Sequence, residues 1–450
     1  MINLFDNNCL DVFAAIRDNS ISAIVTDPPY GLNFMQTLWD KGVPGIEFWK
    51  EMLRISKPGA FLLAFGGTKT HHRLMCAIED AGWELRDCMC WLYGSGFPKS
   101  YSISKNIDRK LGKKREVIGK NIHHRPNHDL QNTWRNKENR KASPMSSEFI
   151  TAPASEEAKK WKGYGTALKP SWEPIIVAMK PIDKNFVNNA LNHGVGGLNI
   201  DKCRIGVAKD KESSSGRWPT NVILNHHPEC IKLGYKSVKS NGHWIAPSKK
   251  SKFLQLKSYG GRDEKTKGKE TIENWQCHIE CPIKLLDRQS GQLKSGKIEA
   301  HHHQEGDSKI GTFKIRDRTG MTYGYGDSGG ASRFYYCAKA SPSERRPYNN
   351  HCTVKPLAVI EYLIKLVTYP DYNLILDPFM GSGTAGIVCK KLGIPFIGIE
   401  NDKDNFKTAK KRINDPWFYQ TEKEREQEKK LDKKKKEKQD KNNTNIPKIF

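Results

Sequence analysis

The sequence predicts an α/β fold, a doubly wound Rossmann-like sheet with an irregular module inserted between its two halves. Three observations support this. Short apolar runs alternate with helix-like periodicity early in the chain, and the same alternation returns after residue 355. Near the end of the chain, an apolar run also leads into a glycine-rich turn and then into a helical pattern. Continuous apolar runs of this kind are typical of parallel strands buried on both faces.

The early alternation contains two apolar runs, residues 22–26 and 60–65, and two glycines close the second. Apolar residues at helical spacing lie between these runs and again at residues 74–81. This part of the chain therefore predicts a strand, a helix, a second strand and a second helix.

The late alternation predicts the other half of the sheet. Pro356 can open a helix, because proline fits the first helical turn. The other expected elements are strands at residues 172–179, 374–377 and 396–400 and a helix at residues 384–392.

The changes of pattern divide the chain into four parts. We expect these to be a first α/β part (1–182, with a flexible insertion at about 112–165), an irregular basic module (183–335), a second α/β part (336–415) and a Lys/Glu-rich tail (416–450).

The chain is strongly basic, with 75 Lys and Arg against 50 Asp and Glu and a formal charge of +25. Nucleic acid is the natural partner of such a chain, although a merely soluble basic protein or a membrane-surface binder has the same charge. The sequence indicates no signal peptide and no membrane span. Eleven cysteines, an odd number, argue against a disulfide framework and favour a reducing cytoplasm.

The glycine-rich turn after residue 377 predicts a cofactor site. Gly381 and Gly383 allow a tight turn and close approach of a ligand to the following helix N-terminus. No lysine follows the last glycine, which argues against a nucleoside triphosphate. Glu400 ends the next apolar run, where doubly wound folds place a carboxylate that binds ribose hydroxyls. These features predict a cofactor that contains adenosine.

The turn Asp27-Pro28-Pro29-Tyr30 follows the first buried strand, at the edge where such sheets bind ligands. The prolines lock the backbone, so that the Asp27 carboxylate and the Pro28 carbonyl become fixed hydrogen-bond acceptors. Two acceptors suit a planar amino group, and they favour a pyramidal nitrogen whose lone pair can attack a methyl group. Tyr30 can stack on the ring that carries the amine.

Together the two turns resemble the S-adenosylmethionine-dependent amino-methyltransferases of DNA, which methylate adenine N6 or cytosine N4. The resemblance covers residues 22–34, 58–67, 169–181 and 350–413. The catalytic turn precedes the cofactor turn, which is the permuted order of the family's β class. The resemblance therefore implies a permuted methyltransferase sheet in which Asp27 and Asp377 lie on neighbouring strands.

The resemblance also implies roles for individual residues. The catalytic set is Asp27, Pro28, Pro29 and Tyr30, and Trp172 is the candidate for packing against a flipped base. The implied S-adenosylmethionine-binding residues are Asn8, Cys9, Lys355, Asp377, Phe379, Gly381, Gly383, Thr384, Glu400 and Asn401. Asn8 departs from the family, in which many members have aspartate at this position.

The resemblance also implies that residues 1–182 are the catalytic half of the core, 336–415 its S-adenosylmethionine-binding half, and 183–335 a target-recognition module. Two close groups of histidine and cysteine lie in this expected recognition module. A tetrahedral zinc held by His227, Cys230, Cys277 and Cys281 would staple this loop-rich part. Buried thiols and surface imidazoles are the alternative. Arginines and aromatic residues of the same module, Arg204, Arg217 and Trp218 among them, offer base-edge and stacking contacts.

The expected function is transfer of methyl to adenine N6 in a base flipped out of DNA, in the cytoplasm of a bacterial or phage-type system. An initial Asp in the catalytic turn favours adenine. The alternatives are cytosine N4, an RNA or glutamine acceptor, and an inactive DNA-binding protein. A homodimer and a cognate restriction endonuclease both stay open.

Overall fold

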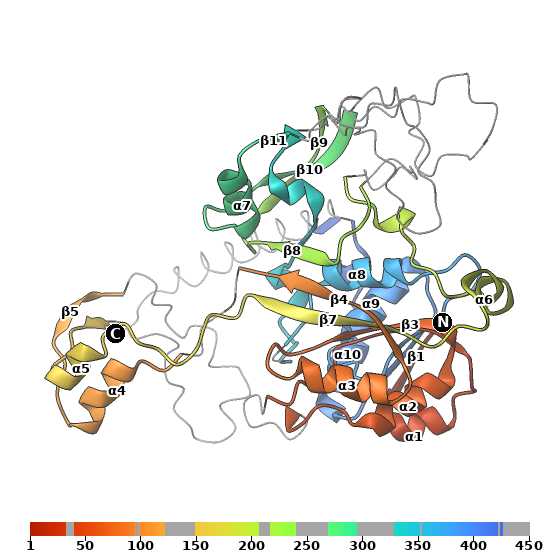
Figure 1. Ribbon diagram of the computed structural model, residues 1–450, viewed down its shortest axis with the longest axis horizontal. Helices are drawn as coiled ribbons and strands as arrows, with labels where there is room; N and C mark the ends of the chain where they lie inside the picture. Colours follow the sequence, from red (N-terminus) through yellow and green to blue (C-terminus); the bar gives the residue numbers. More distant parts are fainter. Residues whose placement is uncertain are drawn as a thin grey trace, which may run out of the picture.

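The central sheet of the computed structural model is nine-stranded over the described residues, in the order β1-β15-β14-β2-β3-β7-β4-β8-β13 (Figure 1). The described residues are 1–32, 40–94, 96, 100–121, 149–206, 217–239, 269–294, 328–351, 353–421 and 424–425. The strands are β1 (Ile2–Asp6), β2 (Ile21–Thr26), β3 (Ser56–Phe65), β4 (Glu84–Leu92), β7 (Trp172–Met179), β8 (Val222–His226), β13 (Tyr336–Lys339), β14 (Ile375–Asp377) and β15 (Phe396–Glu400).

All neighbouring strands of this sheet run parallel except at β7, which is antiparallel to both β3 and β4. An antiparallel strand begins at the edge where its parallel neighbours end. The first residues of β7 therefore lie at the same edge as the turn that follows β2.

Helices cover both faces of the sheet. Alternate residues of a strand face opposite sides, so Ile24 and Leu62 pack on one face while Val25 and Leu63 pack on the other. The first face is covered by α1 (Cys9–Ala14), α2 (Ile46–Ile55) and α3 (His71–Asp80), and the second by α8 (Leu357–Leu366), α9 (Thr384–Leu392) and α10 (Lys403–Asn414). Figure 1 shows the first three helices gathered below the sheet. The predicted doubly wound α/β fold is confirmed.

Several elements have the bounds that the sequence predicts, including β7 and α9. The first strand was not predicted, because β1 lies at the edge of the sheet and only its alternate residues are partly buried. It nevertheless pairs in parallel with β15 along its whole length.

A small lobe projects from the main body on the left of Figure 1. It contains α4 (Ile103–Lys110), β5 (Val117–Lys120), β6 (Phe149–Thr151) and α5 (Glu156–Lys160). Inside it, the buried carboxylate of Asp108 accepts hydrogen bonds from Arg115 and from the Ser155 hydroxyl at 2.5 and 2.7 Å. The insertion expected to be flexible at 112–165 therefore contains secondary structure at β5, β6 and α5, while 122–148 lie outside the described residues. Its flexibility stays a prediction.

The expected recognition module is joined to the sheet. Its strand β8 pairs in parallel with β4 and with β13, so the sheet continues into the module. Its other elements are α6 (Phe186–His193), η4 (Asp201–Cys203), β9 (Ile231–Lys239), β10 (Lys269–Gln276), α7 (Pro282–Ser290), β11 (Leu293–Lys294), β12 (Ser328–Gly329) and η7 (Ala331–Phe334).

The start of the expected tail also belongs to the core. In the short helix η9 (Pro416–Tyr419), which follows α10, Trp417 and Phe418 are buried against α9 and α10. The other short helix of this half, η8 (Pro342–Arg345), follows β13. The rest of the tail, 426–450, lies outside the described residues. None of the helices in the described ranges has both the length and the apolar character needed to cross a membrane.

Candidate active site

The two predicted turns meet at the middle of the sheet. β14 and β2 are neighbours, with Ile375 paired to Ala23 and Leu376 to Ile24. The chain continues from β14 to β15 on one side and from β2 to β3 on the other, so this is the topological switch point, where open α/β sheets form their ligand crevices. Here the hydroxyl of Thr26 donates to Asp377 at 2.7 Å. The prediction that Asp27 and Asp377 lie on neighbouring strands is confirmed, with Asp377 the last residue of β14 and Asp27 directly after the last residue of β2.

The turn after β2 is held by its own side chains. The Tyr30 hydroxyl donates to the Asp27 carboxylate at 2.8 Å and also lies 3.0 Å from Glu173. The Tyr30 carbonyl accepts a hydrogen bond from the Thr70 hydroxyl, next to α3, at 2.6 Å. The turn is therefore fixed in position, and Pro28 and Pro29 add the stiffness of their rings.

Lys355 supplies the positive charge of this site. Its ammonium lies 2.5 Å from Asp27, 3.4 Å from Glu173 and 3.0 Å from the Tyr30 hydroxyl. Burial alone would lower the pKa of Lys355, but the two carboxylates outweigh burial and raise it, so the ammonium stays charged. Two carboxylates against one ammonium leave a net negative charge at the crevice.

Glu173 is a site residue that sequence reasoning missed. It is the second residue of β7, and it reaches the crevice because β7 runs antiparallel to β3 and starts at this edge. Its neighbour Trp172, which we expected to pack against a base, meets the ring of His71 edge-on at 6.0 Å. The stacking role of Trp172 stays a prediction.

The glycine turn after β14 has the backbone that its sequence requires. Gly381 and Gly383 have φ angles of +53° and +80°, a region that side chains other than glycine rarely adopt. A Cβ on Gly383 would also lie 3.0 Å from both Ala409 and Ile413. The turn places Thr384 at the start of α9, so a helix N-terminus points at the crevice.

Arg412, at the end of α10, holds this turn from behind. Its fully buried guanidinium donates to the carbonyl and hydroxyl of Ser382 at 2.6 and 2.8 Å. Sequence reasoning missed it, because a basic residue on an amphipathic helix looks like any surface charge.

The carboxylates of Asp377 and Glu400 are prearranged by backbone donors. Asp377 accepts from the Phe379 N–H at 3.2 Å, and Glu400 accepts from the N–H groups of Gly381 and Asp402 at 2.7 and 2.9 Å. Burial raises the pKa of each carboxyl to about 7, despite these hydrogen bonds. Each therefore gains from further donors, such as the hydroxyls or amine of a ligand.

The remaining predicted cofactor residues lie around this turn. Asn8 caps α1 by accepting from the Leu10 N–H at 3.0 Å, and its neighbour Asn7 donates its backbone N–H to the Glu400 carbonyl at 3.2 Å. Cys9 is buried, whereas Asn401 is exposed. The ring of Phe379 lies 6.0 Å from that of Phe48. Contact of these residues with a cofactor stays a prediction.

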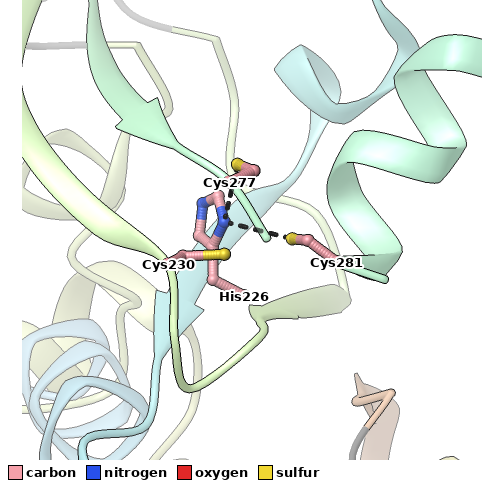
Figure 2. A group of neighbouring side chains, drawn as sticks. All are labelled: His226, Cys230, Cys277 and Cys281. Carbon is pink, nitrogen blue, oxygen red and sulfur yellow. Dashed lines mark hydrogen bonds between the residues drawn. The ribbon is translucent and has the colours of Figure 1, made fainter. Parts of the chain in front are cut away.

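The histidine–cysteine cluster forms, with one correction. His226, Cys230, Cys277 and Cys281 have ligand atoms within 4.8 Å of one another (Figure 2). His227, which we expected in this set, lies in a separate group with Glu229 and His278. Adjacent residues at a strand end point in different directions, and His226 is the one that points inward with 3% exposure.

Known proteins resemble this chain. A family model described as DNA methylase matches residues 21–411. The type II methyltransferase M2.LlaDCHI of Lactococcus lactis subsp. cremoris is 50% identical over 64 residues, 14% of this chain and 23% of that protein. The type II methyltransferase M.HpaI of Haemophilus parainfluenzae is 40% identical over 83 residues, 18% of this chain and 24% of that protein.

The matched region thus spans about a quarter of the length of these curated relatives. Among solved structures, that of M1.HpyAVI is 15% identical, with a TM-score of 0.36, covering 92% of this chain and 99% of that chain.

Proposed function

Because the family model spans residues 21–411, the chain belongs to the N6/N4 family of DNA methylases, and we propose that it transfers methyl from S-adenosylmethionine to adenine N6 in a flipped-out DNA base. S-adenosylmethionine is the cofactor of this family. The observation that carries the proposal is the meeting of Asp27 and Asp377 at the switch point of the sheet.

The residues around the switch point fit this cofactor. The crevice has a net negative charge from Asp27 and Glu173 against Lys355, which suits a cationic sulfonium and an amino group. Glu400 is a buried carboxylate fixed by backbone N–H groups, which suits the hydroxyls of a ribose. Gly381 suits close approach of a ligand, because it has a φ of +53° and no side chain to cover its backbone.

When bound, S-adenosylmethionine supplies an electrophilic methyl group. The residues of the chain would prepare the acceptor nitrogen. Asp27 and the Pro28 carbonyl would accept hydrogen bonds from the amino group of the base and favour a pyramidal nitrogen. The carboxylate of Asp27 already accepts from Lys355 and Tyr30, but each oxygen retains a lone pair for the amine.

Lys355 and Tyr30 would act as positioning residues for Asp27. Both contact its carboxylate at 2.5 and 2.8 Å, so the acceptor oxygens have a fixed direction before a base arrives. This differs from the role implied by the resemblance, in which Lys355 lies near the methionine carboxylate of the cofactor. The contacts with Asp27 and Glu173 support the positioning role.

DNA fits the charge and the exposed aromatic residues of the recognition module. The chain carries a formal charge of +25. Trp218 is 63% exposed, and the guanidinium of Arg204 lies over its ring at 5.6 Å. Such a pair offers both stacking and phosphate contacts. A homodimer and a partner endonuclease stay open.

The test is methyl incorporation from radiolabelled S-adenosylmethionine into unmodified duplex DNA, followed by digestion and identification of the modified nucleoside. We expect N6-methyl-2′-deoxyadenosine from the unaltered protein. Asp27→Ala should lower the rate about 100-fold or more while calorimetry still detects cofactor binding. Asp80→Ala, an exposed acid on α3, is the matched control and should leave the rate unchanged.

Each other outcome has a meaning. Cytosine methylated at N4 would show that the acceptor is cytosine N4 and not adenine N6, while the proposed catalytic residues would stay the same. Incorporation into RNA or protein, but not DNA, would refute the acceptor. A protein that binds the cofactor but methylates nothing, with Asp27→Ala behaving identically, would point to an inactive DNA-binding member of the family.

A further inference from the structure

A second site lies at the end of β8, the last strand but one in the sheet, apart from the switch point. It consists of His226 at the end of β8, Cys230 just before β9, Cys277 just after β10 and Cys281 at the start of α7. In Figure 2 the three sulfur atoms surround the imidazole ring of His226. We propose that these four side chains bind one structural zinc ion, which fixes the β9–β10 hairpin and α7 to the edge of the sheet.

The distances within the cluster match a single tetrahedral ion. The Nδ1 atom of His226 lies 3.7 Å from the Cys277 sulfur and 3.6 Å from the Cys281 sulfur. Zinc bonds of about 2.0–2.1 Å to nitrogen and about 2.3 Å to sulfur separate two such ligands by about 3.6 Å in a tetrahedron. Both nitrogen–sulfur spacings therefore match those of zinc ligands, and the other ligand atoms lie within 4.8 Å of one another.

Thiol–imidazole hydrogen bonds alone explain this cluster less well. A neutral imidazole has one nitrogen that accepts, with a single lone pair. Two sulfur atoms nevertheless approach the same Nδ1 of His226, and the third, from Cys230, lies within the same 4.8 Å group. One cation at the common centre satisfies all four ligand atoms at once. Three sulfurs and one imidazole are a ligand set typical of structural zinc.

The two segments that supply the ligands are built alike. Residues 226–230 and 277–281 both have the pattern ligand-His-x-Glu-Cys. In each, the final cysteine donates its backbone N–H to the carbonyl of the second-position histidine, at 3.0 Å for Cys230 and 3.1 Å for Cys281. Two matching turns that present their first and fifth residues to one point form a paired ligand scaffold.

Contacts around the ligands hold both turns in register. In each turn the second-position histidine accepts the N–H of the following glutamate at 3.2 Å. The rings of His227 and His278 then stack, with centroids 4.2 Å apart and planes at 17°. The His278 backbone N–H also donates to the Cys230 sulfur at 3.4 Å, the kind of contact that orients a metal ligand.

This part of the protein needs such a link. Among the described residues, the buried cluster beneath the hairpin contains Leu224, Cys230, Cys281 and Ile283, with partly buried side chains such as Trp275 and Leu286 packed against it. Two of these four buried residues are cysteines of the proposed site, so a bound ion would add directly to the stability of this small core. The ion would connect β8, which belongs to the sheet, with three elements outside it.

The experiment is metal analysis of the untagged full-length protein after dialysis against a metal-free buffer. We expect about one equivalent of zinc per chain. His226→Ala and Cys281→Ser should lose that zinc. His227→Ala removes a contact around the ligands but no ligand atom, so it should retain most of the zinc. Cys76→Ser, at an exposed cysteine on α3 outside the cluster, is the matched control and should retain all of it. Calorimetry should detect unchanged S-adenosylmethionine binding, because the switch point is separate.

A second measurement uses only the unaltered protein, so it stands even if a variant fails to fold. A mercurial reagent that attacks thiolates should release zinc, which an indicator dye detects. Alkylation without reduction should find Cys230, Cys277 and Cys281 protected until the zinc is removed.

Folded protein without zinc would overturn the proposal. A disulfide among these three cysteines, found by mass spectrometry, would also overturn it, as would iron at one equivalent. Loss of zinc in His227→Ala but not in His226→Ala would refute the assignment of the ligands.

Discussion

Replacing Asp377 with asparagine should stabilise the folded protein at pH 8 much more than at pH 5. Burial raises the pKa of this carboxyl from 3.8 to about 7 in the folded state. The folded protein therefore holds a proton that the unfolded chain releases near its ordinary pKa. The stability this proton provides is fully present below pH 3.8 and is lost as the pH rises towards 7.

The magnitude follows from the size of the shift. One pKa unit corresponds to about 1.4 kcal/mol, so a shift of about three units costs the folded state up to about 4 kcal/mol above pH 7. Part of this loss of stability has already occurred at pH 5, because the unfolded chain is mostly deprotonated there. The free energy of unfolding should therefore fall by a further amount of about 2–3 kcal/mol between pH 5 and pH 8. Asparagine carries no charge, and its carbonyl can still accept from Thr26 and Phe379. The Asp377→Asn protein should therefore not lose this stability as the pH rises.

Urea unfolding without cofactor, followed by tryptophan fluorescence at both pH values, measures this difference. Glu361→Gln is the control, because Lys365 and Lys391 pair with Glu361 at 2.6 and 3.0 Å. Burial opposes these lysines, but together they lower the pKa of Glu361 to about 2. Its folded and unfolded pKa values both lie below 5, so its effect should be nearly equal at the two pH values. A pH-independent effect of Asp377→Asn would refute the reasoning.

Two further substitutions test the crevice. Lys355→Met leaves the carboxylates of Asp27 and Glu173 without their cation, and loss of one partner of a buried ion pair lowers the free energy of unfolding by about 3–5 kcal/mol. The rate of single-turnover methylation should fall about 100-fold or more. Adding Glu173→Gln should restore part of that rate, and no rescue would contradict the charge argument. Gly383→Ala should lower the melting temperature and weaken cofactor binding, since it combines a φ of +80° with contacts of 3.0 Å. Gly393→Ala, at a φ of +70° with open space around it, should cost less, and equal costs would exclude a packing effect.

The pattern of the sequence alone determined the framework of the site. Apolar runs and glycines act through local backbone preferences, so β7 and α9 could be predicted with their observed bounds. The order of the two turns in the chain, combined with the resemblance to a permuted family, predicted that Asp27 and Asp377 lie on neighbouring strands. The strand pairing confirms this.

Tertiary structure alone decided which side chains share the site. Glu173 reaches Tyr30 and Lys355 because β7 runs antiparallel, and a single apolar run does not state its direction. The choice of His226 over His227 depends on which way the end of β8 points. Cys277 and Cys281 are four residues apart, and so are His226 and Cys230, so this matching spacing was a signal for His226 in the sequence. Spacing along the chain limits which side chains can share a site. Strand pairing and burial then decide which of them do, because they set the direction of every side chain.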